Sequence, residues 1–582
     1  MRLFRLTTLL VAALASFACS DASWRDVVPA DWPYSLDAAP ARATHGMVVS
    51  TDRYASEVGV AVLRSGGNAI DAAVATAFAL AVVNPEAGNI GGGGFMVIRL
   101  ADGTTAALDF RERAPAAASH DMYLDEHGEL TDESRVGHRA VGVPGSVAGL
   151  WQAHQRYGSL PWRDLVEPAI GLADGFEVRA RQARSLRHYA EQLAEYPATA
   201  EIFLPGGAPP AVGDRLVQAD LADTLRRIQE LGRDGFYGGV TARLIVAEME
   251  RHGGLISERD LASYDAAWRE PVEFGYRDHT VISMPPTSSG GLTLAAMAKI
   301  LEGYELSDMA WHSARMVHLL AESWKRAYAD RNEYLGDPDF IDIPGERLTS
   351  VEYGAERRAG IAPRRATPSA EVAPGLGPYP VEQQTTHLSA VDAAGNAVSM
   401  TTTINSFYGI KAVVEGAGFF LNNEMDDFAA QPGTPNMFGL VQGEANAIAP
   451  GKRMLSAMTP TIVLRPDGSL LLVVGSPGGA TIITNMFQNI MNVVDYGMDL
   501  VEAVHAPRLH HQHLPDRIDY ERGALDSTTV AALEVMGHTL RERHDDDSLY
   551  PYIGDVQAIM VLPDGTILGV SDPRRGGAAA VY

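Results

Sequence analysis

The sequence predicts a layered protein of mixed helices and strands, of the α+β or layered α/β class. Helical and strand patterns occur in both halves of the chain, and no internal repeat is visible. The 582 residues are 46% hydrophobic and 21% charged, which is enough apolar material for a large core. Length alone suggests about three to four domains.

The net charge of −26 restricts the kind of partner. Nucleic-acid binding and docking on anionic lipid both need basic surface, so the sequence argues against them. The charge is compatible with a soluble enzyme that acts on small molecules.

The N-terminus, "MRLFRLTTLLVAALASFACS", predicts an export signal. Arg2 and Arg5 precede a short apolar run that ends in small residues before Cys19. We therefore expect a signal peptide over residues 1–18, an N-terminal extension over 19–45, and a periplasmic or extracellular protein. A lipid-modified Cys19 that anchors the protein to a membrane remains open, because Ser16 stands where such sites usually carry leucine.

The first half of the chain alternates helices with short strands. Residues 55–85 predict two packed helices, the first ended by Gly66–Gly67 and the second by Pro85. Residues 88–100 form a glycine turn and a strand, and 106–115 form a second strand that carries Arg111. We expect residues 150–280 to be mainly helical, with another helix over 310–335.

The second half begins at an abrupt change of pattern. Residues 361–380 have no helical or strand period, whereas "TTHLSAVDAAGNAVSMTTTIN", from Thr385 to Asn405, alternates like a hairpin. Such a change marks either a linker between domains or a place where the chain is cut. Next come a strand over 459–479 and a helix over 481–497.

The hairpin register places two threonines together. A three-residue loop, 393–395, pairs Asp392 with Asn396 and, further back, Thr385 with Thr403. Directly opposed residues lie about 4.5–5.5 Å apart at Cβ, within hydroxyl contact. Taken alone, the pattern also fits a strand pair that is merely rich in threonine.

Other catalytic motifs fail on their residues. "VVGSPGG" is not the G-x-S-x-G of an esterase, because Val474 stands where the first glycine belongs. The glycines at 91–94 lack the GK[ST] of a phosphate loop and are better suited to close backbone approach. His510, His511 and His513 have no accompanying carboxylate or cysteine pattern, so we expect no metal site there.

Several long motifs, in order, resemble the γ-glutamyltranspeptidase family. "NPEAGNIGGGGFM", "LDFRERAP" and "GVPGSVAGL" are similar to its large subunit. "QTTHLSAVDAAGNAV", "LNNEMDDF", "KRMLSAMTPTIV" and "GSPGG" are similar to its small subunit. The resemblance runs from about Gly46 to Tyr582.

The resemblance implies a self-cleaving precursor. The cut falls between Gln384 and Thr385, which gives a large subunit of residues 46–384 and a small catalytic subunit of 385–582. The fold implied is the αββα four-layer sandwich of the N-terminal nucleophile hydrolases, shared by both subunits. Once Thr385 is the first residue, its own α-amino group, with a pKa near 7.7–8.0, can serve as its base.

The resemblance also assigns the remaining site residues one by one. Thr403 matches the threonine that hydrogen-bonds the nucleophile, and Gly478 and Gly479 match the oxyanion hole, where a following helix favours negative charge. Further matches concern the substrate: Arg111 for its α-carboxylate, Asp427 with Glu424 and Asn405 for its α-amino group, and Ser456 with Ala457 for the carboxylate again. No cofactor or metal is implied.

Two positions depart from the family pattern. The family usually has two serines where this chain has Ser456–Ala457, so one hydroxyl is missing. Phe438 stands in a lid-like loop where relatives can carry tyrosine. Both changes concern substrate affinity rather than the type of reaction.

The sequence therefore predicts an exported, self-processing γ-glutamyl hydrolase/transferase. It would cleave glutathione and related γ-glutamyl compounds and pass the acyl group to water, an amino acid or a dipeptide. The alternative within the superfamily is an acylase for glutaryl-β-lactam side chains, which has less use for Glu424 and Asp427. The alternative from another class is an inactive binding lipoprotein that retains the fold.

Overall fold

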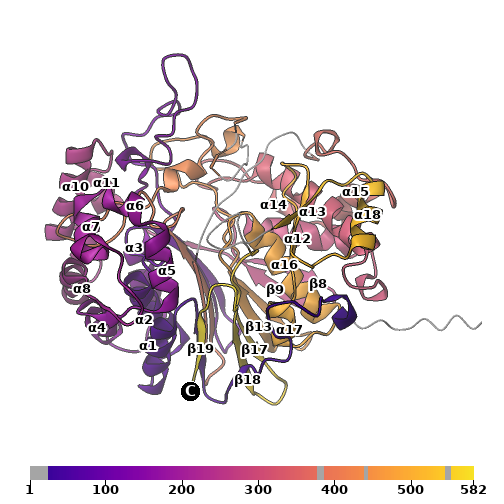
Figure 1. Cartoon of the computed structure of the whole chain (residues 1–582), viewed down its shortest axis with the longest axis horizontal. Helices are drawn as coiled ribbons and strands as arrows, with labels where there is room; N and C mark the ends of the chain where they lie inside the picture. Colours follow the sequence, from indigo (N-terminus) through magenta and orange to yellow (C-terminus); the bar gives the residue numbers. More distant parts are fainter. Residues whose placement is uncertain (1–23, 376–385, 435, 438–442, 544–551) are drawn as a thin grey trace, which may run out of the picture.

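Two antiparallel sheets form the centre of the molecule, and helices cover the outer face of each (Figure 1). The structure is a computed structural model that describes residues 24–375, 386–434, 436–437, 443–543 and 552–582. Within these residues each of the two sheets has seven strands. The layers follow the order helix–sheet–sheet–helix, which confirms the expected four-layer fold.

The first sheet, the hairpin sheet, takes strands from both sides of residue 385. The part of the chain before that residue supplies four strands and the part after it supplies three. In spatial order they are β19 (Ala578–Val581), β2 (Met47–Ser50), β10 (Thr386–Val391), β11 (Ala397–Thr403), β3 (Gly93–Arg99), β4 (Thr105–Asp109) and β7 (Ala267–Arg269).

The second sheet also takes strands from both parts of the chain. Its strands in spatial order are β1 (Ala41–Ala43), β18 (Ile567–Ser571), β17 (Gln557–Val561), β13 (Leu470–Gly475), β12 (Thr461–Leu464), β9 (His279–Ser283) and β8 (Val272–Tyr276). We call it the glycine-loop sheet, because its strand β13 leads into the loop with Gly478 and Gly479. Two small sheets lie outside the core: β5 (Phe176–Glu177) with β6 (Arg215–Leu216), and β14 (Leu509–His510), β15 (Ile518–Glu521) and β16 (Leu540–Arg543).

The two outer layers come from different parts of the sequence (Figure 1). On the side of the hairpin sheet lie α1 (Arg53–Arg64), α2 (Ala69–Val83), α3 (Ser146–Tyr157), α4 (Trp162–Ala173), α5 (Ala180–His188), α6 (Ala190–Ala194), α7 (Pro197–Phe203), α8 (Ala219–Leu231), α9 (Asp234–Tyr237), α10 (Gly239–His252) and α11 (Glu258–Ser263). On the side of the glycine-loop sheet lie α12 (Gly290–Leu301), α13 (Ala314–Tyr334), α14 (Gly345–Leu348), α15 (Val351–Ala359), α16 (Thr481–Val494), α17 (Leu500–His505) and α18 (Ser527–Val535).

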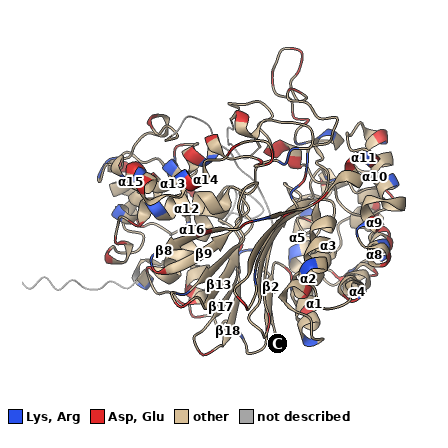
Figure 2. Ribbon diagram, turned by 180° about the vertical axis from the view of Figure 1, so that it is seen from behind, with Lys and Arg blue, Asp and Glu red and all other residues tan. Residues whose placement is uncertain are grey.

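Alternation along the strands divides the apolar side chains between two cores. In β3, Met96 and Ile98 pack with the helices over the hairpin sheet, whereas Phe95 and Val97 pack between the two sheets. Successive side chains of a strand point to opposite faces, so a strand buried on both faces reads as continuously apolar. Charged residues accordingly colour the helices and loops, while the central strands are mostly uncharged (Figure 2).

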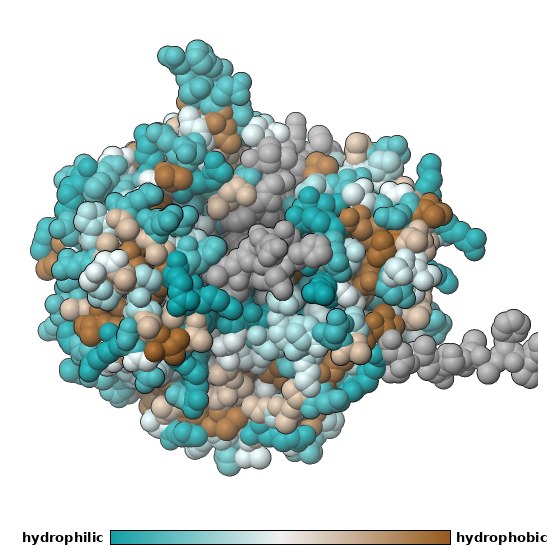
Figure 3. Space-filling view, in the orientation of Figure 1, coloured by the Kyte–Doolittle hydropathy of each residue, from teal (hydrophilic) through white to brown (hydrophobic). Residues whose placement is uncertain are grey.

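The predicted helix pair at residues 55–85 is confirmed as α1 and α2. Asn68 caps α2 and forms a capping box with Asp71, and Gly66 adopts a φ of 90° between the helices. Every residue of α2 is buried, as expected for a core helix. No helix among the described residues has both the length and the apolarity needed to cross a bilayer. On the face seen in Figure 3, apolar residues are scattered among polar ones.

The predicted hairpin is also confirmed, in the predicted register. Val391 pairs with Ala397, and the ladder continues back to Thr386 opposite Thr402. The Asp392 carboxylate accepts hydrogen bonds from the backbone N–H groups of Ala394 and Asn396 at 2.9 and 3.0 Å and thereby fixes the turn.

One predicted element needs correction. The single strand expected over 459–479 is two strands, β12 and β13, joined by a turn in which Gly468 has a φ of 80°. Both halves of that run are apolar, so the Pro-Asp-Gly-Ser turn between them was the overlooked signal. The region 150–280 is mainly helical, as expected, and it also contains the short strands β5, β6, β7 and β8, of which β7 and β8 are edge strands of the two large sheets.

Candidate active site

The glycine run at residues 91–94 lets β3 approach β11 closely. A Cβ on Gly92 would lie 2.0 Å from the carbonyl oxygen of Thr403, and one on Gly94 would lie 2.4 Å from that of Thr401. Asn89 completes this contact, because its Nδ2 donates to the Thr403 carbonyl at 2.8 Å. The glycine run therefore allows the expected close backbone approach, which holds the end of β11 in place.

Arg111 lies fully buried just beyond β4, at the centre of an acidic cluster. Its guanidinium forms ion pairs with Glu424 and Asp427, and it lies 3.5 Å from Glu112. Its Nε also donates to the Met454 carbonyl at 3.2 Å. A buried guanidinium needs such partners, since an unpaired charge inside the protein is costly. The arginine and the acidic residues are thus one cluster and not two separate groups.

Three buried carboxylates share this one guanidinium, which changes their protonation. Burial, reinforced by the neighbouring Glu424, raises the pKa of Glu112 well above its ordinary value. Burial raises the pKa of Glu424 and Asp427 as well, against the opposite effect of Arg111. Burial thus favours the protonated form in this cluster, and the Arg111 guanidinium opposes it.

Asn405 connects the acidic cluster to the end of β11. Its backbone N–H donates to the Thr403 hydroxyl at 2.7 Å, and its Nδ2 donates to the Asn423 carbonyl at 2.9 Å. Its φ of 67° lies in the left-handed region, which asparagine tolerates better than most residues. Its Oδ1 is buried and accepts no hydrogen bond from any described residue.

Ser456 and Ala457 lie on the segment that follows Met454. The Ser456 hydroxyl accepts a hydrogen bond from the Met458 N–H at 3.1 Å, and its carbonyl accepts two from Ser289, both at 2.6 Å. Ala457 is fully buried in the core between the sheets. This segment reaches the acidic cluster through the contact between Met454 and Arg111.

Gly478 and Gly479 join β13 to α16. Their φ angles of 138° and 65° are those that glycine adopts at little cost. The Gly478 carbonyl accepts from the N–H and hydroxyl of Thr481, at 3.2 and 2.5 Å, and so begins the first turn of α16. The pair therefore lies at a helix N-terminus, where the backbone favours negative charge.

The loop that follows β13 and carries Gly478 and Gly479 begins at Gly475, which is held against the start of β10. A Cβ on Gly475 would lie 2.1 Å from the His387 ring, so only glycine allows the two sheets to meet there. The His387 ring is held in place, with Nδ1 2.8 Å from the Thr401 hydroxyl. Burial lowers the pKa of His387 to about 3, so the ring is neutral.

The structure thus brings Arg111, Glu424, Asp427, Asn405 and Thr403 together. Ser456 and Ala457 lie on the segment that contacts Arg111 through Met454. Gly478 and Gly479 follow β13, whose last residue, Gly475, meets His387. Gln384, Thr385, Phe438 and Cys19 lie outside the described residues, so their roles remain predictions. Glu112 and His387 were not among the residues predicted from the sequence. A second carboxylate beside Arg111 and a histidine two residues after Thr385 were the available signals.

The histidines of "LHHQH" have separate protein partners. His510 contacts Thr484 and Gln512, both at 2.8 Å, and His513 contacts the Ser369 carbonyl at 2.9 Å. His511 lies 3.4 Å from Asp516. Among the described residues these three histidines do not converge on a common point with a carboxylate.

Comparison with known proteins gives a consistent result. Residues 55–582 match a family model described as gamma-glutamyltranspeptidase. The chain is 46% identical over 570 residues to a glutathione hydrolase proenzyme of Escherichia coli (strain K12), covering 97% of each chain. It is 48% identical over 554 residues to one of Pseudomonas aeruginosa, covering 94% of this chain and 96% of that one.

A solved structure shares the fold over nearly the whole length. The cephalosporin acylase of Bacillus halodurans superposes with a TM-score of 0.83 at 29% identity, covering 95% of this chain and 99% of the other. The sequence is thus more similar to glutathione hydrolase proenzymes than to this acylase, although the architecture is common to both.

Proposed function

Since the chain belongs to the γ-glutamyltranspeptidase family, we propose that it cleaves glutathione with Thr385 as the nucleophile. The protein is a γ-glutamyl hydrolase/transferase made as a self-processing proenzyme. Beyond this, we propose which residues carry out the reaction, which molecules accept the acyl group and where the protein is located.

The proposed reaction begins at the new N-terminus. The α-amino group of Thr385 takes the proton of its own hydroxyl, and the oxygen attacks the γ-carbonyl of the substrate. The N–H groups of Gly478 and Gly479 stabilise the oxyanion, and the Thr403 hydroxyl positions the nucleophile. The amine leaves with the proton, and a γ-glutamyl ester remains. Water, an amino acid or a dipeptide then attacks the ester and restores the Thr385 hydroxyl.

The acidic cluster is the observation that carries the substrate assignment. A γ-glutamyl compound ends in an α-carboxylate and an α-ammonium group, and Arg111 with Glu424 and Asp427 is the opposite arrangement of charges. A planar guanidinium suits a carboxylate, and carboxylates suit an ammonium. The buried Oδ1 of Asn405 adds a further acceptor for the ammonium. A glutaryl group has no α-ammonium, so this cluster disfavours the acylase alternative.

We also propose that the protein is exported. Arg2 and Arg5, the apolar run to Ala18 and the small residues before Cys19 support a signal peptide over residues 1–18. Cell fractionation locates the protein, and labelling with a fatty acid decides whether Cys19 carries a lipid anchor. A protein that stays in the cytoplasm with residues 1–18 intact contradicts the export proposal.

The decisive experiment combines processing with catalysis. Purified protein is separated on a denaturing gel, the smaller fragment is sequenced from its N-terminus, and glutathione cleavage is measured with and without a dipeptide acceptor. We expect the smaller fragment to start at Thr385, and Thr385→Ala to remain one inactive chain. Thr385→Ser keeps a hydroxyl and should retain some processing. A smaller fragment with any other first residue refutes the assignment, and an inert binding module would stay a single band.

A further inference from the structure

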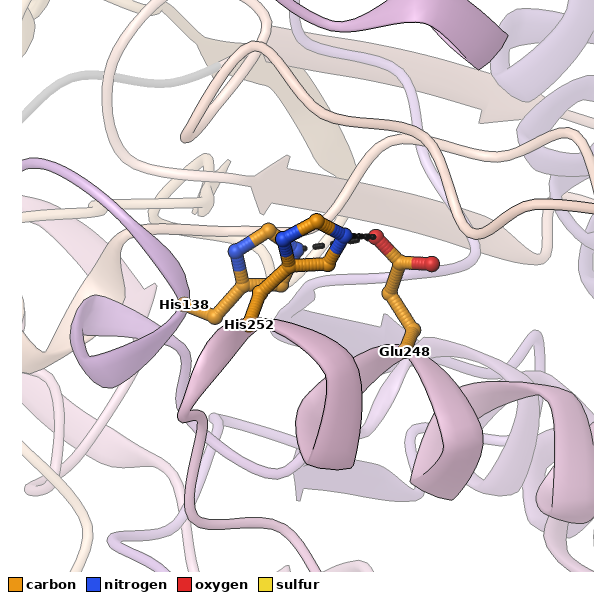
Figure 4. Close-up of side chains that lie close together, drawn as sticks. All are labelled: His138, Glu248 and His252. Carbon is orange, nitrogen blue, oxygen red and sulfur yellow. Dashed lines mark hydrogen bonds and ion pairs between the residues drawn. The ribbon is translucent and has the colours of Figure 1, made fainter.

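We propose that His138, Glu248 and His252 form a site for one divalent transition-metal ion of the zinc type. The site lies on the outer helical layer and does not depend on the γ-glutamyl chemistry. Figure 4 shows both imidazole rings facing the same oxygen of the Glu248 carboxylate.

The three side chains are arranged as ligands of one ion. Nε2 of His138 lies 3.0 Å from Oε1 of Glu248, and Nε2 of His252 lies 3.6 Å from the same oxygen. A tetrahedral Zn²⁺ has ligand bonds of about 2.0–2.2 Å, so its ligand atoms lie roughly 3.3–3.6 Å apart. The observed separations bracket that value.

The local structure keeps two of these ligands in place. Glu248 and His252 are one turn apart on α10, and positions i and i+4 share a helix face. His138 belongs to the short 3-10 helix His138–Ala140 and is buried. The His252 side chain is about half exposed (48%), so it can turn to aim its nitrogen at an ion and leaves a coordination position open to solvent.

The surroundings favour a cation. Arg251 contacts the other carboxylate oxygen of Glu248 and leaves Oε1 to the two histidines. A cavity of about 620 Å³ adjoins the site, and three more carboxylates line it, those of Glu201, Asp220 and Glu415. Arg251 is the one cation of that lining, and it also lies 3.1 Å from Glu415.

A second cluster of the same composition shows what disqualifies such a group. His318, Glu322 and His538 also lie together, but His318 and His538 hydrogen-bond each other at 2.8 Å. Glu322 is engaged by Lys325 and Arg326, which places two positive charges at the cluster. In that cluster the two histidines bind each other, whereas on α10 both histidines approach one carboxylate oxygen, which in the apoprotein is hydrogen-bonded to His138 at 3.0 Å.

A metal ion at this site would fasten α10 to the loop that supports the acidic cluster. The loop carrying His138 reaches Asp426 through Ser134, whose hydroxyl donates to that carboxylate at 2.8 Å. It reaches Asn423 through the Arg135 carbonyl at 3.0 Å. We therefore expect bound metal to raise the melting temperature of the protein, because an ion that binds only the folded state stabilises it.

The test is calorimetric titration of ZnCl₂ into tag-free, chelator-treated enzyme, with the melting temperature measured in parallel. We expect one Zn²⁺ per chain, and at least tenfold weaker binding in both His252→Ala and Glu248→Gln. His127→Ala is the matched control: His127 is exposed and lies 3.6 Å from Glu126, outside the proposed site, so this variant should bind Zn²⁺ like the wild type. Co²⁺ in the same site should give the visible absorption of a low-symmetry site, and His252→Ala should abolish it.

Two results would overturn the proposal. One is a wild-type enzyme that takes up no Zn²⁺ in the titration. The other is a His252→Ala variant that binds Zn²⁺ as tightly as the wild type. Because His252 is partly exposed at the end of α10, its removal should leave the circular dichroism spectrum unchanged, so weaker binding cannot be ascribed to misfolding.

Discussion

Arg111 is held by carboxylates that, in our proposal, also bind the substrate, and this determines how single substitutions in the cluster should behave. Its ion pairs with Glu424 and Asp427 are fully buried. Removing one partner of a buried pair leaves the other charge without compensation. We therefore expect substitutions in the acidic cluster to alter both substrate binding and the ion pairs of the cluster. Each substitution needs a comparison variant that keeps the charge.

Arg111→Lys keeps the charge but loses the two-pronged geometry of the guanidinium. We expect kcat/KM for γ-glutamyl substrates to fall by at least tenfold, because an ammonium cannot bind a carboxylate in the same bidentate way. Asp427→Asn should have a similar effect through the α-ammonium. Steady-state kinetics on glutathione and on a glutaryl amide provide the measurement. If both variants cleave γ-glutamyl substrates normally and the wild type prefers the glutaryl amide, the enzyme is an acylase.

Ala457→Ser restores the hydroxyl that the family usually has. A hydrogen bond to a charged group contributes about 1.5–3 kcal/mol, and water can replace part of it. We expect KM for γ-glutamyl substrates to fall by roughly tenfold at most, with kcat nearly unchanged, because the α-carboxylate is remote from the bond that breaks. A substrate analogue without that carboxylate should show no gain. Weaker binding in the variant would mean that the pocket is shaped around Ala457 for another acyl group.

Site residues could be predicted from the sequence where they stand in long motifs that follow the order of the family. Arg111, Glu424 and Asp427 stand in long motifs, and the structure brings them together. Glu112 was missed because its role arises from sharing one guanidinium with two distant carboxylates, which no local pattern records. The direct pairing of Arg111 with the acidic residues was missed for the same reason.

At the scale of elements, the contact between the hairpin β10–β11 and the strand β13 holds together the segments that carry the proposed catalytic residues. Gly475 at the end of β13 meets the ring of His387 in β10, and the Ser399 hydroxyl of β11 donates to the Val474 carbonyl at 3.1 Å. The hairpin and its register could be predicted from the alternating pattern and the turn residues. The contact between the two sheets could not be predicted, because it depends on which strands of the two sheets lie face to face.

Gly475→Ala should disturb this contact. The added methyl group would lie 2.1 Å from a His387 ring that hydrogen bonds hold in place, so the sheets must separate slightly. We expect a loss of about 1–3 kcal/mol of unfolding free energy, typical of overpacking, together with reduced activity. Gly171→Ala is the control, because nothing lies within 4 Å of its added methyl group in α4. Denaturant unfolding of both variants measures the difference, and equal stability would show that the contact is not tight.

His387 makes the hairpin sensitive to acid. Burial lowers its pKa to about 3 in the folded protein, whereas the unfolded value is near 6.5. Between these values the unfolded chain binds a proton that the folded chain does not. The titration of His387 therefore has no effect on stability above about pH 6.5, and it becomes unfavourable as the pH falls, by about 1.4 kcal/mol per unit.

His387→Gln removes this titration. The stability of the wild type relative to the variant should be constant above pH 7 and should fall by about 2 kcal/mol between pH 6.5 and 5. Urea unfolding at a series of pH values gives both curves. Parallel curves over that range would show that His387 gains its proton in the folded state.

At the scale of the whole molecule, the proposed cut between Gln384 and Thr385 would divide both large sheets and not separate two domains. The chain before residue 376 supplies β2, β3, β4 and β7 to the hairpin sheet, and the chain after residue 385 supplies β10, β11 and β19. The glycine-loop sheet is divided likewise, with β1, β8 and β9 from the first part. The length of the chain predicts several domains. The two parts of the chain instead complete each other's sheets and so share one core.

This interleaving predicts how the processed protein behaves. β10 pairs with β2 on one side and β11 pairs with β3 on the other, so the cut subunits are joined by continuous ladders through the middle of a sheet. Separating them would expose the apolar core between the sheets and leave strand edges unpaired. We expect processed enzyme to elute from a sizing column at the mass of the intact chain and to dissociate only together with unfolding in denaturant. The uncleaved Thr385→Ala chain should elute at the same position, which serves as the control. If one subunit is recovered alone and folded under native conditions, the subunits have independent cores and the shared-sheet description is wrong.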